Sequence, residues 1–202
     1  MLKYGITILL GYLIGSLSSG VLLSRFVIKD DIRSHGSGNS GATNMLRVNG
    51  KKYGILTLLG DMLKGIISVL IGRFLIGGTL GGMIGTVSAV IGHNFPIFFG
   101  FKGGKGIATS FGSLLFVIPV QVLIAFAAFL LTVFLTRYVS LGSIIAAVVL
   151  PLAVLLTMPF NPAIFLLSLF LGLLAILRHY QNIIRLLHHQ ESKLSFHKKT
   201  DV

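Results

Sequence analysis

Three short polar segments hold the side chains that could do chemistry in this otherwise apolar chain. They are Gly36-Ser37-Gly38-Asn39-Ser40-Gly41-Ala42-Thr43-Asn44, Phe101-Lys102-Gly103-Gly104-Lys105-Gly106 and Arg178-His179-Tyr180-Gln181-Asn182. Glycine lets backbone N–H groups approach an anion closely, and Lys or Arg side chains neutralise its charge. These residue types therefore predict binding sites for phosphorylated compounds.

The first segment has the spacing G-x-G-x-x-G over residues 36–41. It follows an apolar helix rather than a strand, so it does not qualify as a dinucleotide fingerprint. Gly, Ser and Asn also make ordinary polar turns, which is the simpler interpretation. The residues from Ala42 to Arg47 predict a short helix, however, and a glycine loop that leads into a helix N-terminus often binds anions. We expect a phosphate here, with a bidentate contact from Arg47.

The second segment resembles a phosphate-binding P-loop but differs in spacing. A P-loop would need glycine in place of Phe99 and a hydroxyl residue in place of Gly106. The alternative is a glycine hinge whose lysines reach the lipid head groups. Lys105 directly precedes an apolar segment that we expect to be helical, and a cation at a helix N-terminus is unfavourable unless an anion is near. This position favours a bound anion.

The composition predicts an integral membrane protein. Mean hydropathy is +0.93 and only 11% of the residues are charged, against about a quarter in soluble domains. The chain has no cysteine, which excludes disulfides, thiolate metal sites and a cysteine nucleophile. The net charge of +12 predicts attraction to anionic lipids and carries information on topology.

A helical span needs roughly 20 apolar residues. We expect spans at about Leu2–Ser24, Ile55–Ile76, Leu80–Asn94, Ile107–Ile118, Val120–Leu135, Leu141–Thr157 and Ala163–Leu177. The segment Ile107–Leu135 could instead be one long helix, but two helices around Pro119 place nearly all Lys and Arg residues on one side, as the positive-inside rule requires.

The expected fold is therefore an all-α integral membrane protein with about seven transmembrane helices. Its N-terminus is outside and its C-terminus is cytoplasmic, so the glycine-rich loops and the Arg178–Asn182 segment share the cytoplasmic face. We expect a single domain over residues 1–202, with a flexible cytoplasmic tail at about 188–202.

The remaining ionisable residues narrow the chemistry. Asp61 and Lys64 lie three residues apart inside an expected span, and mutual neutralisation is the simplest interpretation. A proton-coupled transporter or channel for an organic phosphate is the competing class, but the sequence has no inverted repeat. A lipid-binding scaffold is a second alternative, which three separate anion-type motifs argue against. No carboxylate or thiolate cluster accompanies the histidines, so we expect no metal site.

Serine or paired-acid catalysis is not expected either. The chain has no Gly-x-Ser-x-Gly elbow, no histidine followed five residues later by aspartate, and few carboxylates. What remains is positioning and electrostatic stabilisation by cations, amides and backbone N–H groups.

Five ordered motifs resemble the PlsY family, the bacterial acylphosphate:glycerol-3-phosphate acyltransferases. They cover essentially the whole chain apart from the tail, and as a set they are far more specific than any one of them. The motifs are Gly36–Asn44, Gly60-Asp61-Met62-Leu63-Lys64-Gly65, Gly92-His93-Asn94-Phe95-Pro96, Gly100-Phe101-Lys102-Gly103-Gly104-Lys105-Gly106 and Arg178-His179-Tyr180-Gln181-Asn182.

The resemblance implies transfer of a fatty acyl group from acyl phosphate to the 1-hydroxyl of glycerol 3-phosphate, which yields lysophosphatidic acid and inorganic phosphate. It implies no cofactor, no nucleic-acid partner and no direct use of acyl-CoA. It also implies a place in the bacterial cytoplasmic (inner) membrane among its lipids, with an active site on the cytoplasmic side, and an enzyme upstream that produces acyl phosphate.

On this basis we expect catalytic roles for Ser37, Arg47, Lys105, His179 and Asn182. His179 and Asn182 would orient glycerol 3-phosphate, and either His179 or the substrate's own phosphate would accept the hydroxyl proton. The residues expected to bind phosphate or to support the loops are Gly36, Gly38, Asn39, Ser40, Gly41, Thr43, Asn44, His93, Asn94, Lys102, Gly103, Gly104 and Gly106.

Overall fold

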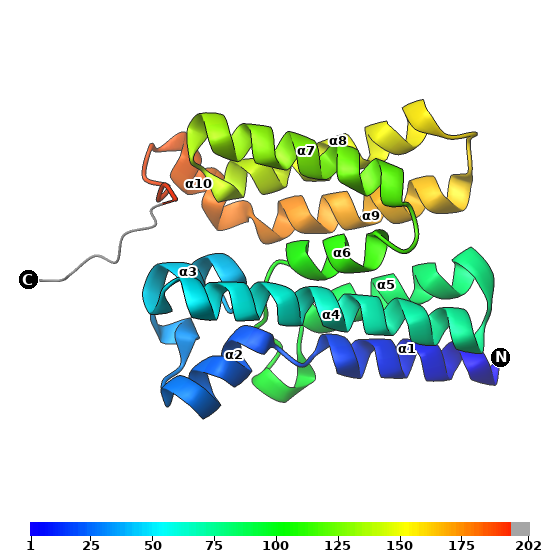
Figure 1. The fold of residues 1–202 in the computed structure, drawn as a ribbon, viewed down its shortest axis with the longest axis horizontal. Helices are drawn as coiled ribbons and strands as arrows, with labels where there is room; N and C mark the ends of the chain where they lie inside the picture. The colour runs from blue at the N-terminus through cyan, green and yellow to red at the C-terminus, as the bar shows by residue number, and fades with distance from the viewer. Residues whose placement is uncertain (195–202) are drawn as a thin grey trace, which may run out of the picture. The chain divides into compact units, whose positions relative to one another are not determined.

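The computed structural model describes residues 1–194, and every regular element in that range is a helix (Figure 1). The chain forms two compact units, residues 1–113 and residues 114–194. The N-terminal unit contains α1 (Leu2–Gly15), α2 (Ser19–Leu23), the π-helix η1 (Ser24–Ile28), the 3₁₀ turns η2 (Ile32–Ser34) and η3 (Ile97–Phe99), α3 (Ala42–Asn49), α4 (Lys51–Leu75), α5 (Gly78–Asn94) and most of α6 (Ile107–Leu114). The C-terminal unit contains α7 (Pro119–Thr136), α8 (Val139–Thr157), α9 (Pro162–Arg178) and α10 (Tyr180–Leu187).

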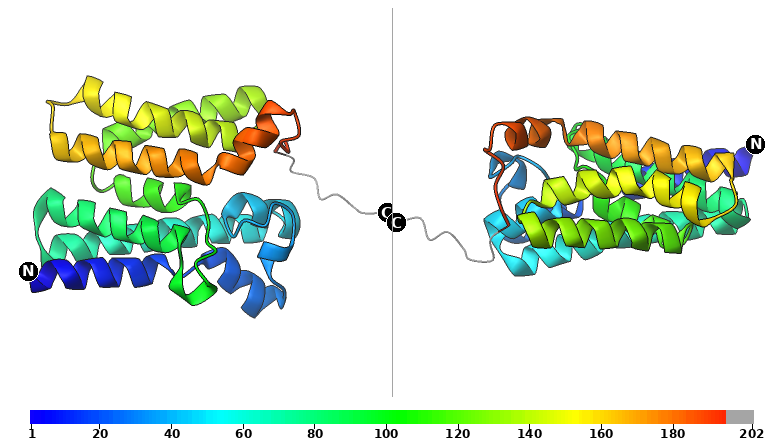
Figure 2. Two further views of the ribbon diagram at one scale, coloured as in Figure 1. Left: turned by 180° about the vertical axis from the view of Figure 1, so that it is seen from behind. Right: turned by 90° about the horizontal axis from the view of Figure 1, so that it is seen from above.

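Glycines allow close packing of the long helices in the N-terminal unit. Helices α1, α4 and α5 pack against one another, and α3 lies on α4 (Figure 2). Gly72 in α4 and Gly81 in α5 face each other so closely that a Cβ on either would overlap the carbonyl of the other. In a lipid environment helix association depends on such contacts, because lipid chains are as apolar as leucine.

In the C-terminal unit α8 packs against both α7 and α9, and α10 bends away from α9 by 58° (Figure 2). Large apolar side chains on these helices are exposed, including Phe134 and Leu156, each more than four-fifths accessible. Exposure of this kind is expected for helices that face lipid chains.

The lengths of the helices decide which of them can cross a bilayer. Four helices in residues 1–194 are long and apolar enough, and the number rises to six if the two bent pairs α1 with α2–η1 and α9 with α10 each count as one span. The expected break at Pro119 is confirmed, since α7 begins there. The expected span Ile107–Ile118 is shorter than predicted: α6 has eight residues, about 12 Å, and a bilayer core is about 30 Å thick.

The first expected span, Leu2–Ser24, is broken. Helix α1 ends at Gly15 and the chain bends by 43° before it continues in α2. The carbonyl of Leu17, in the break, accepts a hydrogen bond from Lys64 Nζ at 3.1 Å. A broken helix inside a membrane needs such a partner for its backbone groups, and a partner 47 residues away along the chain cannot be recognised from the apolar pattern.

The chain after α10 is more firmly held than the sequence indicates. Glu191 is buried, and the backbone N–H of Leu194 donates to the carbonyl of Arg137 at 2.7 Å. Residues 188–194, the first half of the tail expected to be flexible, are therefore attached to the C-terminal unit. Residues 195–202 lie outside the described residues.

Candidate active site

The first glycine-rich loop is organised by the side chain of Asn44, which is buried in α3. Its Nδ2 donates to the carbonyls of Ile32, His35 and Asn39 at 3.2, 3.0 and 2.9 Å, and its Oδ1 accepts from the backbone N–H of Ser37 at 2.9 Å. One amide therefore holds the loop at several points, with the N–H of Ser37 oriented toward Asn44.

The glycines allow the loop to wrap around this amide. Gly36 has φ +59°, and a Cβ there would overlap Asn44 Oδ1. Asn39 Oδ1 accepts from the N–H of Gly41 at 2.8 Å, and α3 then begins at Ala42, as the sequence predicts. The remaining expected residues differ in exposure: the side chains of Ser37 and Arg47 are exposed, that of Thr43 is partly buried and that of Ser40 is buried.

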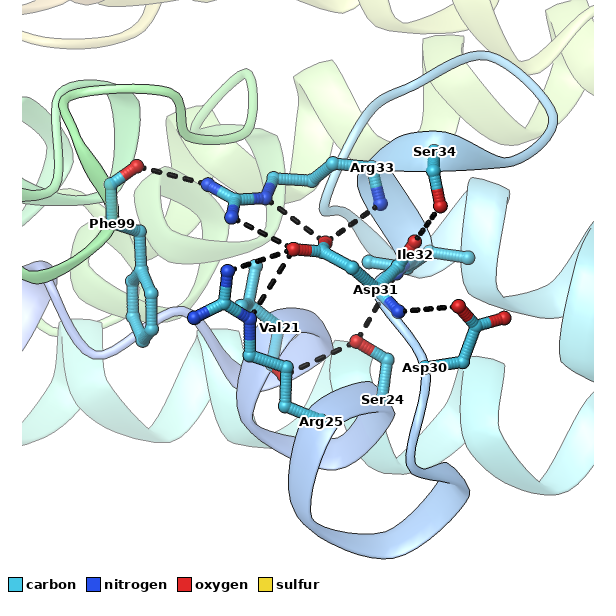
Figure 3. Close-up of polar contacts among 9 residues, drawn as sticks. All are labelled: Val21, Ser24, Arg25, Asp30, Asp31, Ile32, Arg33, Ser34 and Phe99. Atoms are coloured by element: carbon cyan, nitrogen blue, oxygen red, sulfur yellow. Dashed lines mark hydrogen bonds and ion pairs between the residues drawn. The ribbon is translucent and has the colours of Figure 1, made fainter.

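The chain just before this loop is joined to the chain before the second loop by a cluster around Asp31 (Figure 3). The Asp31 carboxylate accepts from Arg25 and, in a bidentate pair, from Arg33 at 2.8 and 3.0 Å. Arg33 Nη1 also donates to the carbonyl of Phe99 at 2.9 Å. Phe99 lies three residues before Lys102, so Arg33 links the bases of the two glycine-rich loops.

Hydrogen bonds from Arg33, opposed by burial and helped by Arg25, hold the pKa of Asp31 well below its usual range. A carboxyl group whose pKa is lower in the folded than in the unfolded protein stabilises the fold at pH values above its unfolded-state pKa of about 4. This stabilisation is lost as pH falls through the folded-state pKa. We expect Asp31→Asn to lower the thermal midpoint at pH 7 and the difference from the wild type to shrink as pH falls below about 4.

Thermal unfolding in detergent between neutral and acid pH measures this difference. Asp30→Asn is the matched control, since Asp30 pairs with His35 on an exposed part of the same turn, and we expect it to change the midpoint little. A constant offset between Asp31→Asn and the wild type at all pH values would contradict the assignment.

The second glycine-rich loop folds back on the end of α5. The N–H of Gly104 donates to the carbonyl of His93 at 3.1 Å. A Cβ on Gly103 would overlap that carbonyl, and a Cβ on Gly104 would overlap the imidazole ring of His93. Gly106 has φ +82° and packs against the Asn94 side chain. The loop lysines are placed differently: Lys102 is exposed and Lys105 is partly buried.

The expected ion pair between Asp61 and Lys64 is confirmed, at 2.9 Å and almost fully buried. The structure adds a third member, His93, whose Nδ1 lies 2.7 Å from Lys64 Nζ and 3.6 Å from Asp61 Oδ1. The sequence gives no sign of this contact, because His93 lies on a different helix 29 residues away.

Two of the expected binding residues have buried polar atoms without a protein hydrogen-bond partner among the described residues. They are the hydroxyl of Ser40, 1% exposed, and both side-chain amide atoms of Asn94, 0% exposed. Native proteins rarely leave such groups unpaired, so each of them indicates a ligand or an ordered water.

The third segment joins α9 to α10 in the C-terminal unit. His179 Nδ1 lies 2.7 Å from the carbonyl of Ala175. A carbonyl only accepts, so Nδ1 carries the proton and the lone pair of the neutral ring is on Nε2. Asn182 Nδ2 donates to Glu191 Oε1 at 2.8 Å. That the third segment meets the two glycine-rich loops stays a prediction.

Glu191, which the sequence analysis does not single out, holds the side chain of Asn182, one of the expected site residues. It also accepts from Ser140 Oγ at 2.9 Å and from Arg185 Nε at 2.7 Å. Burial opposes its ionisation, but the hydrogen bonds from Arg185, Asn182 and Ser140 outweigh this and lower the pKa of Glu191. One feature of the sequence could have pointed to Glu191: the chain has only five Asp and Glu residues, and Glu191 is one of them.

The helices and loops described above define a multi-pass membrane protein with two glycine-rich loops, and comparison with known proteins identifies its class. The glycerol-3-phosphate acyltransferase family model matches residues 5–189. The chain is 50% identical to a glycerol-3-phosphate acyltransferase of Syntrophotalea carbinolica, over 96% of this chain and 98% of that one. It is 47% identical to one of Thermoanaerobacter pseudethanolicus, over 98% of both chains.

Solved structures agree with this result. The chain resembles the crystal structure of PlsY (YgiH), an integral membrane glycerol 3-phosphate acyltransferase, in its glycerol 3-phosphate form, with a TM-score of 0.88 and 36% identity over 95% of this chain and 96% of that one. The lysophosphatidic acid form of PlsY matches with a TM-score of 0.84, also at 36% identity, over 96% of both chains. The protein belongs to the PlsY family of glycerol-3-phosphate acyltransferases and is an acyltransferase of phospholipid synthesis.

Proposed function

We propose that the protein transfers a fatty acyl group from acyl phosphate to the sn-1 hydroxyl of glycerol 3-phosphate. The hydroxyl oxygen attacks the acyl carbonyl carbon, the bond between that carbon and the phosphate oxygen breaks, and inorganic phosphate leaves. The product is 1-acyl-glycerol 3-phosphate, that is, lysophosphatidic acid. The reaction requires no redox partner, and the activated donor reduces the need for acid–base groups.

The observation that carries this proposal is the joining of two glycine-rich loops by Arg33 in a chain of the acyltransferase family. Both proposed substrates carry phosphate, so two anion-type loops match the reaction better than one. The related PlsY has been solved in glycerol 3-phosphate and lysophosphatidic acid forms, which correspond to the acceptor and the product proposed here.

We assign roles to the site residues on this basis. The side chains of Ser37, Arg47 and Lys105 bind the phosphates, while His179 and Asn182 orient the acceptor. Backbone N–H groups of the two loops add to the phosphate sites, except those of Ser37, Gly38, Gly41 and Gly104, which donate within the protein. The buried hydroxyl of Ser40 and the amide of Asn94 face a ligand or an ordered water in the working enzyme, because neither has a protein partner among the described residues. Asn44 and His93 support the loops through the contacts described above.

We also propose that the protein is one domain of about seven spans in the bacterial inner membrane, with the active site at the cytoplasmic face. The concentration of Lys and Arg near the loops supports this orientation, and the family match over residues 5–189 extends across both compact units. The acyl chain of the donor then lies among the helices, while glycerol 3-phosphate arrives from the cytoplasm.

The donor is tested with purified protein in detergent, labelled glycerol 3-phosphate, and either palmitoyl phosphate or palmitoyl-CoA. We expect lysophosphatidic acid from palmitoyl phosphate alone. Product from palmitoyl-CoA would replace the proposed donor but keep the acyltransferase class. Folded protein that forms no product from either donor would overturn the proposed reaction.

His179 is one candidate for the group that accepts the hydroxyl proton, because its Nε2 carries the lone pair. The phosphate of glycerol 3-phosphate is the other candidate. Glutamine places an amide where the imidazole stood but cannot act as a base. If His179 is the base, His179→Gln lowers kcat about 100- to 10,000-fold and removes the acid limb of the kcat–pH profile. Near-normal turnover in His179→Gln would assign the proton to the substrate phosphate.

A further inference from the structure

The buried cluster of Asp61, Lys64 and His93 has one more member than is needed to neutralise the charges of Asp61 and Lys64. All three side chains are at most 6% exposed, and Asp61 is the only carboxylate in any expected span. Ionisable residues inside a membrane are costly and usually functional. A lone Asp61–Lys64 pair would already cancel both charges, so the contact with His93 calls for another explanation.

The hydrogen-bonding capacity of Lys64 determines the state of His93. A lysine paired with a carboxylate is an ammonium with three donors and no acceptor. Around Nζ lie Asp61 Oδ1 at 2.9 Å, the Leu17 carbonyl at 3.1 Å and His93 Nδ1 at 2.7 Å. His93 Nδ1 therefore accepts, and the proton of the neutral imidazole lies on Nε2.

The other side of the same ring touches the second glycine-rich loop. A Cβ on Gly104 would overlap His93 Nε2 and lie 2.8 Å from Cε1, so the ring edge rests on the α-carbon of Gly104. The His93 carbonyl also accepts from the Gly104 N–H. The loop is thus in contact with His93 through both its ring and its backbone.

We propose that Asp61 and Lys64 are positioning residues for the second glycine-rich loop. They hold His93 as the Nε2–H tautomer against Gly104, and the ring in turn fixes the backbone of residues 103–106. This inference rests on the proposed function of that loop as a phosphate-binding element. Asp61 and Lys64 act through His93 and do not touch substrate.

The test uses the full-length Asp61→Leu/Lys64→Met double variant, which removes the donor to His93 Nδ1, adds no new donor beside it and leaves no buried charge unpaired. Ser68→Ala is the matched control, because Ser68 is buried one turn further along α4 and its hydroxyl donates to the backbone carbonyl of Lys64 rather than to a side chain of the cluster. We expect the double variant to fold and kcat/KM to fall about 100-fold, as for a misplacement of about 1 Å, mainly through a higher KM for a phosphate substrate. Ser68→Ala should keep wild-type constants.

A second readout needs no turnover, so it stays valid even if the proposed reaction fails. ¹⁵N NMR of histidine-labelled wild-type protein, with the His93 signals assigned by loss in His93→Gln, reports which ring nitrogen carries the proton. We expect His93 to be protonated at Nε2 only, and this preference to be lost in the double variant. Protonation at Nδ1 in the wild type, or wild-type kinetic constants in a folded double variant, would overturn the inference.

Discussion

Lys105→Ala is expected to lower kcat/KM by about 100- to 1,000-fold, the effect of removing one group that stabilises transition-state charge. Lys105 lies in the second glycine-rich loop, two residues before α6 begins at Ile107, and is partly buried. In the proposed reaction negative charge grows on the departing phosphate. The lysine stabilises that charge, and without it a partly desolvated anion loses its partner.

Steady-state rates with palmitoyl phosphate and glycerol 3-phosphate measure the loss. Lys52→Ala is the control, since it removes the same charge from an exposed position at the start of α4, and we expect it to leave kcat/KM unchanged. Lys105→Arg should recover part of the loss, because the charge remains but the shape of the group differs. Wild-type rates in Lys105→Ala would remove this lysine from the site.

Asn44→Asp is expected to abolish most of the activity and to lower the free energy of unfolding as well. The replacement has the same shape and keeps an acceptor for the N–H of Ser37, but it loses the Nδ2 donor. A buried carboxylate oxygen would then face the carbonyls of Ile32, His35 and Asn39. The amide shares its two N–H hydrogens among these three carbonyls, so the loss of about 1 kcal/mol for each hydrogen costs roughly 2 kcal/mol, before any electrostatic repulsion.

Thermal unfolding and the rate of lysophosphatidic acid formation test this together. Asn49→Asp makes the same change at the last residue of α3, whose amide makes no tertiary hydrogen bond within residues 1–194, and we expect only a small loss from the helix dipole. Equal effects of the two substitutions would show that the Asn44 amide does not hold the loop.

Most of the helical fold could be predicted from the sequence. The ends of α4, α5, α7, α8 and α9 lie close to the predicted ends, because runs of apolar residues must form helices in a membrane and because Pro119 cannot continue one. The short α6 and the break after α1 were missed. The apolar composition of a segment indicates that it can lie in a lipid bilayer. It does not indicate which side chains of other helices form hydrogen bonds with the backbone of that segment where its helix is broken.

In the candidate site, too, some features could be predicted from the sequence and others could not. The glycine-rich loops, the start of α3 at Ala42 and the pairing of Asp61 with Lys64 were predicted, since each depends on residues close in sequence. The contacts of Arg33 with Phe99 and of Lys64 with His93 were not, because they join residues 66 and 29 positions apart. Glu191 was assigned to a loose tail, although it holds Asn182.

The sequence by itself determined the class of environment, the helices and the identity of the phosphate-type motifs, because composition and local spacing are sufficient for these. Apart from the Asp61–Lys64 pair, which the sequence predicts, only the tertiary structure decided what each acid does. In residues 1–194 every carboxylate has a cationic or histidine partner: Asp30, Asp31, Asp61 and Glu191 contact His35, Arg25 and Arg33, Lys64, and Arg185 respectively. In a chain with net charge +12 cations are abundant and carboxylates scarce, so the position of each acid selects which basic group is fixed in place.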